Sequence, residues 1–403
     1  MNNTLPDNSP AALQSRLRLA VALRRQGDLA GTEKLLREVL AIDGQNYDAL
    51  HMLGVLASEN GDGKTAVDLI EAALRIDAGQ AAAHYNLGNA LRLLKRHVDA
   101  VQCYDRAIAL NPEHGGAHNN RANCLFDNRR FNEAVTGFDR ALAINPGAAE
   151  IWHNRGKALA ELNIAQEAIA SFKRALELGG DATRLAYELA SLGAGNAPPA
   201  APEQFIASLF DNYAETFDRH LVDQLHYSAP LATINAVKRF TVADNLDVLD
   251  LGCGTGLCAP LLDPIAKSLT GVDLSPKMLE KARALGLYDA LFNANVDTFL
   301  TQHVAEFDLV VATDLFIYIG DLREIFAGTA RALKPRGLFA FSVEQCTDRD
   351  FFLQPSKRYA QSEPYLRRLA ADRGFTVQCI EPCFIRKDGN SDIHGLIAVL
   401  QRI

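Results

Sequence analysis

The stretch LDVLDLGCGTG, residues 246–256, decides the fold of the C-terminal half of this chain of 403 residues. Its apolar run at 248–251 is typical of a buried parallel strand. Glycine then returns at every second position, as Gly252, Gly254 and Gly256. Glycine is needed where the backbone must adopt a positive φ, or where a ligand comes too close for a Cβ atom. The stretch therefore predicts a strand that runs into a ligand-binding turn.

The sequence after this turn continues as alternating helices and strands. A helix is expected from residue 257, with its N-terminus toward the ligand. The second strand ends in Asp273, whose carboxylate is suited to accept hydrogen bonds from both hydroxyls of a ribose. The further elements are strands at 269–273, 291–294, 307–312 and 338–343 and a helix at 321–333. This alternation predicts an α/β domain with a mostly parallel sheet.

The last part of the chain predicts a different pairing of strands. Strands are expected at 376–380 and 393–400, joined by the turn Lys387-Asp388-Gly389-Asn390. Turns of the Asp-Gly type join antiparallel strands into a hairpin. The whole order closely resembles the Rossmann-like, or class I, family of S-adenosylmethionine-dependent methyltransferases, whose sheet ends in such a hairpin. A dinucleotide dehydrogenase would continue with a second βαβ half or a substrate domain.

By this resemblance, the motifs hold S-adenosylmethionine, which leaves as S-adenosylhomocysteine. The residues implied for its methionine part are Asp250, Gly252, Gly254 and Gly256. Asp273 would hold the ribose, Leu274 would lie against the adenine ring, and Asp314 in the segment 313–318 would line the methyl-donor end. Asn295 stands where the family usually has an aspartate near the adenine amino group, and an amide carbonyl still accepts that hydrogen bond.

Residues 203–240 precede the methyltransferase core at 241–403 and are expected to form a helical lid. Part of this segment, FDNYAETFD at 210–218, resembles the N-terminal segment of small-molecule methyltransferases, whose helices cover the cofactor. By that resemblance Tyr213, His220 and Tyr227 are candidates to face the pocket, Tyr213 as a cofactor contact. The alternative is that these aromatic residues only pack the lid.

The catalytic residues are less defined, since an oxygen acceptor needs a general base and an ionised carboxylate or amine does not. The candidates are His220, Asp314 and Tyr359. Asp314 follows the fourth strand, where open α/β sheets bind ligands, although it could equally cap the next helix. The segment around Tyr359 resembles a family segment that usually has histidine where Gln361 stands, which leaves His220 as an alternative base.

The first half of the chain repeats every 34 residues, from residues 13, 47, 81, 115 and 149. The eighth position of each repeat is small and the twenty-fourth is mostly bulky, as in the pair Gly88 and Tyr104. Each repeat therefore predicts two antiparallel helices that cross closely at the small residue. The pattern resembles five tetratricopeptide repeats over 13–182, and a capping helix at 183–193 would complete an all-α solenoid at 13–192.

Polar residues recur on one helix face of these repeats, at the sixth and ninth positions. They are Asn86, Asn120 and Asn154 at the sixth, and Asn89, Asn123 and Lys157 at the ninth. An asparagine amide both donates and accepts, so such a ladder can bind the backbone of an extended peptide. It resembles the ladder of the O-linked N-acetylglucosamine transferase repeats, and it implies a protein or peptide partner. The alternative is that asparagine is simply frequent at these positions.

Composition limits the remaining functions. The formal charge of -8 disfavours a nucleic-acid binder, and the seven scattered cysteines form no CxxC pair that would favour a metal site. The N-terminus resembles no signal peptide, and no apolar run is long enough to span a membrane, so a cytoplasmic protein without membrane contact is expected. The segment 1–12 is expected to be a disordered tail, and 193–202, rich in Gly, Ala and Pro, a linker.

Three functions remain open at this point. The first is methyl transfer to an unidentified acceptor, with the repeats recruiting the partner. The second is a non-catalytic scaffold that binds S-adenosylmethionine, and the third is an NAD-dependent oxidoreductase. DNA methylation is disfavoured because Asp314-Leu315-Phe316-Ile317 lacks the Asp/Asn-Pro-Pro-aromatic signature.

Overall fold

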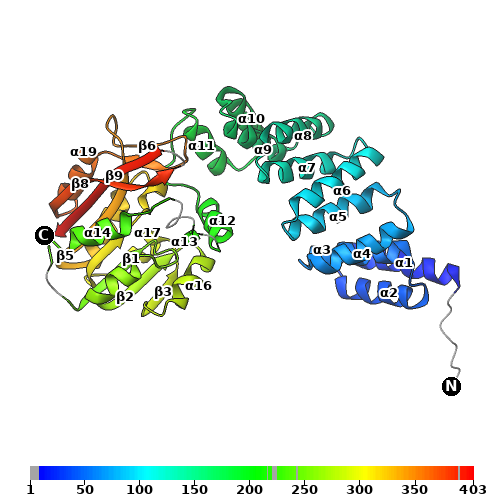
Figure 1. Cartoon of the computed structure of the whole chain (residues 1–403), viewed down its shortest axis with the longest axis horizontal. Coiled ribbons are helices and arrows are strands. Elements are labelled where there is room, and N and C mark those ends of the chain that lie inside the picture. The colour runs from blue at the N-terminus through cyan, green and yellow to red at the C-terminus, as the bar shows by residue number, and fades with distance from the viewer. Residues whose placement is uncertain (1–8, 216, 220–224, 242–243, 389–390) are drawn as a thin grey trace, which may run out of the picture. The chain divides into compact units, whose positions relative to one another are not determined.

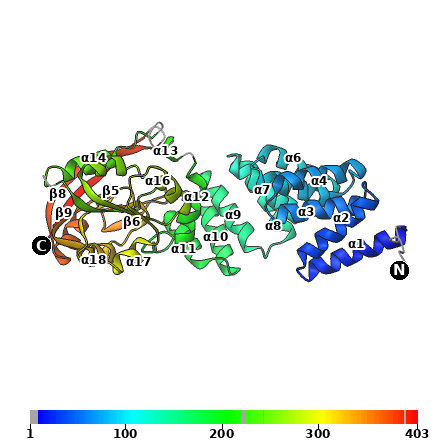
Figure 2. The ribbon, with the colours of Figure 1, turned by 90° about the horizontal axis from the view of Figure 1, so that it is seen from below.

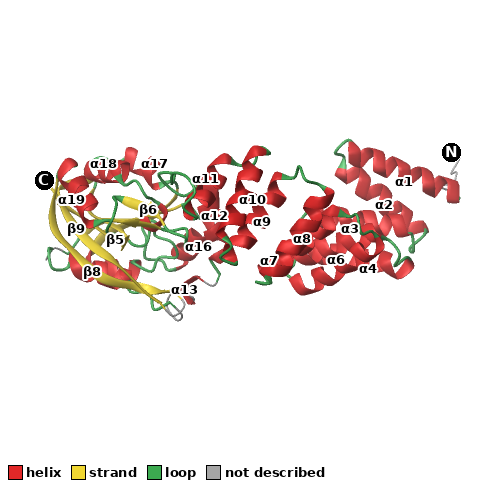
Figure 3. Cartoon of the chain, turned by 90° about the horizontal axis from the view of Figure 1, so that it is seen from above, coloured by secondary structure: helices red, strands yellow, loops and turns green. Residues whose placement is uncertain are grey.

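The computed structural model describes residues 9–215, 217–219, 225–241, 244–388 and 391–403. The chain divides into two compact units, Met1–Gly180 and Asp181–Ile403. Figure 3 shows that the described part of the first unit is built from helices and loops, whereas strands and helices share the second. No helix among the described residues combines the length and apolar character needed to cross a bilayer.

From residue 9 onward, the first unit is a succession of five helix pairs in chain order (Figure 1). The pairs are α1 (Pro10–Arg25) with α2 (Leu29–Ile42), α3 (Tyr47–Glu59) with α4 (Gly63–Ile76), α5 (Ala81–Leu93) with α6 (His97–Leu110), α7 (Gly115–Asp127) with α8 (Phe131–Ile144), and α9 (Ala149–Glu161) with α10 (Ala165–Glu177). Each helix packs on its partner, and the second helix of a pair packs on the first helix of the next. The predicted all-α solenoid is confirmed.

The crossing inside each pair depends on the small residue at the eighth position. A Cβ atom at Gly88 would lie 2.6 Å from Cε1 of Tyr104, and one at Gly156 would lie 2.5 Å from Cε1 of Phe172. Both aromatic rings are fully buried. The helices therefore approach each other at a distance that only glycine or a small side chain permits.

The turn inside each pair has the same backbone conformation in all five repeats. Its residues have φ between 58° and 83°, namely Gly27, Gly61, Lys95, Arg129 and Asn163. Left-handed backbone ends a helix readily at glycine, whereas a residue with a Cβ adopts it at a cost of about 1 kcal/mol. Repeats three to five therefore carry a small strain that repeats one and two avoid.

In the described part of the second unit, nine strands form one sheet. Helices lie on both faces of this sheet (Figures 1 and 2). The strands are β1 (Leu246–Leu251), β2 (Ala266–Asp273), β3 (Ala290–Asn293), β4 (Phe307–Ala312), β5 (Leu333–Gln345), β6 (Phe351–Leu353), β7 (Tyr359–Gln361), β8 (Phe375–Asp388) and β9 (Ser391–Arg402). The first five are parallel in the order β3-β2-β1-β4-β5, and β9 then pairs antiparallel with both β5 and β8. The predicted parallel sheet with its terminal antiparallel hairpin is confirmed.

The sheet is buried on both faces, because alternate residues of its central strands enter two different cores. Leu249 and Val310 pack in the core that includes α18, whereas Val248 and Leu309 pack in the core that includes α14. The helices and short 3₁₀ turns of this unit are α11 (Ala182–Ser191), α12 (Glu203–Tyr213), α13 (Phe217–Arg219), α14 (Ala229–Val237), α15 (Ala259–Leu262), η2 (Asp263–Ile265), α16 (Pro276–Ala284), α17 (Val296–Thr301), η3 (Phe316–Tyr318), α18 (Arg323–Ala332) and α19 (Glu363–Asp372). The short strands β6 and β7 were not predicted.

Helix α11, which we expected to cap the repeats, belongs to the second compact unit. Its Tyr187 hydroxyl donates to the carbonyl of Lys357, and the Lys357 ammonium pairs with the buried Glu188 carboxylate at 2.7 Å. The ring of Tyr187 also packs near that of Tyr359, with centroids 6.3 Å apart. The helix therefore has its polar partners in the sheet domain.

The expected linker is also held by the second unit. Its residues 197–202, which we call the strap, lie beside the loop that follows β4, where Ala200 and Ile319 form an isolated antiparallel bridge. The amide of Ala201 donates to the carbonyl of Tyr318 at 2.8 Å, and the amide of Gly320 donates to the carbonyl of Pro199 at 2.8 Å. The strap is thus a bonded part of the sheet domain.

Candidate functional site

A cavity of about 840 Å³ opens at the carboxyl ends of the parallel strands. Open α/β sheets bind ligands at this edge, and the volume is typical of a site for a small molecule or cofactor. Its wall comes from the turn after β1, the end of β2, the start of α17, the loop after β4, helices α12 and α13 and the strap. The cavity therefore gathers most of the motifs that the sequence singled out.

The glycine turn contributes its residues unequally. Gly254 has φ 55° and open space around the position of a Cβ atom, so a ligand can lie directly against its backbone. Gly252 has φ 67°, and a Cβ there would lie 2.9 Å from Cδ1 of Leu315. Gly256 does not line the cavity, and a Cβ atom there would lie 2.7 Å from Cδ1 of Leu285.

Asp273 is fixed beside this turn. Its Oδ2 accepts the amide of Gly254 at 2.9 Å, and its Oδ1 accepts the amide of Ser275 at 2.8 Å. Burial raises the pKa of this carboxyl, and the two amide hydrogen bonds oppose the increase. Each carboxylate oxygen has a second lone pair, so the group keeps acceptor capacity in the cavity wall.

Asp250, the acid implied for the methionine part of the cofactor, does not lie in the cavity wall. It is 1% exposed, is not among the residues that line the cavity, and accepts the hydroxyl of Tyr288 at 2.7 Å. Burial raises the pKa of Asp250 to about 7, although the Tyr288 hydrogen bond opposes this. The Asp250 side chain is therefore buried and bonded to Tyr288, away from the cavity wall.

The two residues implied for adenine lie in the cavity wall, but the side-chain amide of Asn295 already makes hydrogen bonds within the protein. Leu274 and Asn295 both line the cavity. The Asn295 Oδ1 accepts the amide of Asp297 at 2.7 Å as the cap of α17, and its Nδ2 donates to Glu203 at 2.6 Å. Asp297 also lines the cavity, and burial raises its pKa. The site thus contains two carboxylates near Asn295 that the sequence did not indicate.

The lid helices are attached to the sheet by three carboxylates. Each carboxylate bonds a polar side chain at the start of the segment that follows one of the first three strands. The pairs are Asp218 with Thr255 after β1, Asp211 with Ser275 after β2 at 2.5 Å, and Glu203 with Asn295 after β3 at 2.6 Å. The lid therefore closes over the positions where a cofactor would meet the sheet.

The aromatic candidates in the lid have different places. Tyr213 lines the cavity, and its ring packs at 5.2 Å, edge to face, on that of Phe217. Tyr227 also lines the cavity; it hydrogen-bonds Thr313, and burial raises its pKa. His220 lies outside the described residues.

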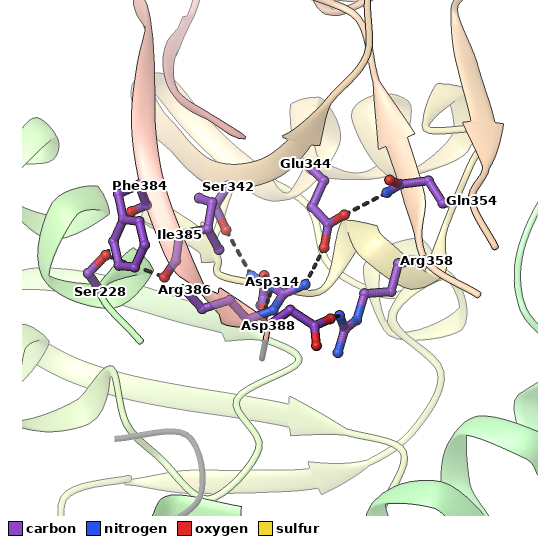
Figure 4. A network of polar contacts seen from close by, with 10 residues as sticks. All are labelled: Ser228, Asp314, Ser342, Glu344, Gln354, Arg358, Phe384, Ile385, Arg386 and Asp388. Carbon is purple, nitrogen blue, oxygen red and sulfur yellow. Dashed lines mark hydrogen bonds and ion pairs between the residues drawn. The ribbon is translucent and has the colours of Figure 1, made fainter. Parts of the chain in front are cut away.

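Asp314 forms part of a buried ion-pair network (Figure 4). It has φ 55°, lines the cavity, and accepts Nη1 of Arg386 at 3.0 and 2.9 Å. Nη2 of Arg386 donates to Glu344, which also accepts from Gln354 at 2.5 Å. Burial raises the pKa of Asp314, and the charge of Arg386 opposes this. The Asp314 carboxylate is thus ion-paired with the Arg386 guanidinium, and it does not cap a following helix.

Tyr359, a catalytic candidate, is fully buried and does not line the cavity. Its hydroxyl donates to the carbonyl of Pro198 at 2.6 Å, so it holds the strap. Gln361, which stands at the family histidine position, donates to the carbonyls of Phe316 and Ile319 at 3.1 and 2.8 Å. Tyr359 therefore holds the strap and Gln361 holds the loop that follows β4, and the catalytic assignment of Tyr359 is not supported by this geometry.

Sequence reasoning missed the strap, the three lid carboxylates, Arg358 and Arg386. Arg386 lies between the expected strand 376–380 and the expected turn at 387–390, and the structure places it inside β8. The others lie in loops or on an amphipathic helix, where charges are ordinary. Among the described residues, no group of three or more His, Cys, Asp or Glu side chains gathers as metal ligands.

The asparagine ladder of the repeats is half-buried and partly bonded to itself. Nδ2 of Asn120 donates to Oδ1 of Asn89 at 2.9 Å, which also accepts the Tyr104 hydroxyl at 2.8 Å. Asn86 contacts the ring of His51 at 2.9 Å. At the other end, the ammonium of Lys157 lies 4.9 Å from the ring centroid of Phe126. Asn123 and Asn154 are half-buried in the same way.

The two units define an α-helical repeat array followed by an α/β domain of the methyltransferase fold. A methyltransferase domain family matches residues 249–341, and tetratricopeptide repeat families match 23–88, 81–114, 99–149 and 119–183. The chain therefore joins a tetratricopeptide repeat array to a methyltransferase domain.

Curated relatives resemble only part of the chain. A ubiquinone biosynthesis O-methyltransferase from Thiobacillus denitrificans is 33% identical over 101 residues, which are 24% of this chain and 43% of the relative. A malonyl-[acyl-carrier protein] O-methyltransferase from Salmonella typhimurium is 30% identical over 142 residues, which are 35% of this chain and 54% of the relative. The chain thus spans about half the length of these relatives.

Solved structures similar to the chain include a MamA crystal structure, which is 26% identical in sequence. The match covers 40% of this chain and 93% of that chain, with a TM-score of 0.38. Another is YrrB, described as a tetratricopeptide repeat protein with an unusual peptide-binding site, with 23% identity, 41% and 86% covered, and a TM-score of 0.38.

Proposed function

We propose that the second unit transfers a methyl group from S-adenosylmethionine to an acceptor, and that the repeats bind a protein or extended peptide. The observation that carries the first part is the pairing of Gly254 and Asp273 in one cavity wall. The glycine leaves open space against its backbone, and the carboxylate beside it keeps lone pairs for hydroxyl donors. Together they fit a nucleoside with a ribose.

The residues around this pair have separate tasks in the proposed reaction. S-adenosylmethionine, when bound, supplies a methyl group already activated by its sulfonium. Asp273 would bind the ribose hydroxyls, Leu274 would cover the adenine face, and Asn295 would stand near the adenine amino group. Tyr213 and the other lid aromatics would exclude water, since a dry and fixed geometry provides much of the rate of methyl transfer.

Replacement of Asp273 by Ala tests cofactor binding. Two hydrogen bonds to a charged acceptor are lost, so the Kd of S-adenosylhomocysteine should rise at least about 100-fold in titration calorimetry. Asp263→Asn, an exposed carboxylate in η2, is the matched control and should leave the Kd unchanged. Stabilisation of the parent protein by NAD, with none by S-adenosylhomocysteine, would instead favour an oxidoreductase.

Transfer itself is tested with methyl-labelled cofactor and an extract of cells that lack the protein. Label should move to an extract component only when the parent protein is added, and mass spectrometry then identifies the acceptor. Tight binding of S-adenosylhomocysteine without any transfer would favour the scaffold function.

The repeat ladder is the proposed site for the partner. Asparagine amides at a constant spacing suit the regular backbone of an extended peptide. Because these side chains are half-buried, their rotamers are already restricted before a peptide binds. Simultaneous replacement of Asn86, Asn120 and Asn154 by Ala should weaken binding of a copurifying partner at least about tenfold. An unchanged affinity in the triple variant would contradict this site.

A further inference from the structure

Two of the residues that line the cavity are arginines, and their charges are balanced differently. Figure 4 shows both arginines with their carboxylate partners. The side chain of Arg386 is 1% exposed and lies between the carboxylates of Asp314 and Glu344. Its cationic charge is therefore more than compensated by its neighbours. It organises the wall and has little charge left for a ligand.

Arg358 is balanced more weakly. Its side chain is 26% exposed and pairs with Asp388 at 3.0 Å, whose side chain is 55% exposed. Asp388 is not among the cavity-lining residues, whereas Arg358 is. An ion pair this exposed contributes at most about 1 kcal/mol. Exchange of the Asp388 carboxylate for the carboxylate of a ligand therefore costs little.

The surface next to Arg358 is apolar and aromatic. The Tyr318 hydroxyl hydrogen-bonds Arg358, and the ring of Tyr318 packs edge to face on Phe210, with centroids 5.5 Å apart. Phe210 in turn packs on Phe217 at 5.8 Å. All four residues line the cavity. A ligand that reaches Arg358 therefore has an aromatic wall beside it.

We propose that the methyl acceptor carries a carboxylate on an apolar body, and that Arg358 binds this carboxylate in place of Asp388. This rests on the proposed methyltransferase function. The planar guanidinium matches the two oxygens of a carboxylate. A phosphate monoester fits less well because it carries a second negative charge. That charge would face the two carboxylates of Asp314 and Glu344, which the single positive charge of Arg386 does not fully balance.

The test is a titration of the full-length protein saturated with S-adenosylhomocysteine. The probes are 3-phenylpropanoate and 6-phenylhexanoate, each beside its neutral amide, with phenyl phosphate as the alternative anion. At least one carboxylate should bind about tenfold or more tightly than its amide and than phenyl phosphate. Arg358→Gln should remove this difference, and Arg358→Lys should keep part of it.

The Kd of S-adenosylhomocysteine separates the possible failures. It should stay within about twofold of the parent value in both Arg358 variants. The control Arg239→Gln, which removes an exposed arginine paired with Glu381, should change neither affinity. If the parent protein does not bind S-adenosylhomocysteine, the proposed function fails. If the parent protein does bind S-adenosylhomocysteine, four results overturn the carboxylate proposal alone. The acids and amides bind equally well, neither the acids nor the amides bind, phenyl phosphate binds most tightly, or Arg358→Gln has no effect.

Discussion

The repeats and the methyltransferase domain differ in how far apart along the chain their important contacts are formed. In the repeats, Gly88 meets Tyr104 within one repeat, and Gly156 meets Phe172 at the same spacing. In the second unit, Asp314 meets Arg386 across 72 positions of the chain. A regular local spacing can be recognised in a sequence, whereas a pair of distant residues cannot. The predictions below test this contrast, from the largest expected effect to the smallest.

Asp250→Asn should produce the largest change in stability, and it should depend on pH. The folded protein raises the pKa of this carboxyl from 3.8 to about 7, so ionisation opposes folding. Both states are protonated below the unfolded pKa, and stability is then lost as pH rises through the folded pKa. The loss amounts to about 4 kcal/mol by pH 7 to 8. The variant, whose amide still accepts from Tyr288, should lack this loss.

The measurement is hydrogen exchange of the β1 amides in parent and variant at pH 5 and pH 8. The stability advantage of the variant should be much larger at pH 8. The single tryptophan, Trp152, lies in α9, and its denaturation curve should be the same in both proteins. An advantage that is equal at both pH values would exclude Asp250 as the titrating group.

Gly88→Ala tests the periodic contact of the repeats. The new Cβ would lie 2.6 Å from the buried Tyr104 ring, and such overpacking costs about 1–3 kcal/mol, less the better helix propensity of alanine. The Trp152 fluorescence transition should move to lower denaturant concentration. Gly147→Ala, at a turn glycine with no close neighbour, is the control and should have little effect. An unshifted transition in Gly88→Ala would mean that the crossing can relax.

Tyr359→Phe tests whether the buried hydroxyl holds the strap. Loss of its hydrogen bond to the Pro198 carbonyl should cost about 1 kcal/mol, which corresponds to roughly fivefold faster local opening. Exchange of the Ala201 and Gly320 amides should accelerate, while the central β5 amides stay unchanged. The Kd of S-adenosylhomocysteine should change little. A loss of methyl transfer with an unchanged strap would restore the catalytic assignment of Tyr359.

Lys95→Gly should give the smallest effect, and it should be stabilising. Lys95 is exposed and has φ 58°, a conformation that glycine adopts without strain. The Trp152 transition should move to higher denaturant by an amount that corresponds to about 1 kcal/mol or less. The reverse change, Gly61→Lys at the same position of repeat two, should destabilise by a similar amount. Equal transitions in the two variants would mean that the turn conformation carries no cost.

The sequence by itself determined the elements whose signals are local or periodic. The 34-residue period located the helix pairs and the small residue at each crossing, because every repeat meets the same neighbours. The apolar strands and the glycine turn after 248–251 predicted a mostly parallel sheet and the edge where a ligand binds. Asp273, Leu274 and Asn295 were found in the same way, since each lies at the end of a strand or within two residues after it.

Only the tertiary structure decided which side chains share the cavity with these motifs. The Asp250 side chain lies in the core and accepts a hydrogen bond from Tyr288. The Tyr359 hydroxyl donates to the strap, and Arg386 of the terminal hairpin donates to Asp314. Helix α11 and the strap joined the sheet domain although their composition is that of a cap and a linker. The physical reason is that a short strand or loop fixes its own backbone, whereas the direction and partner of a side chain depend on packing against residues distant in the chain.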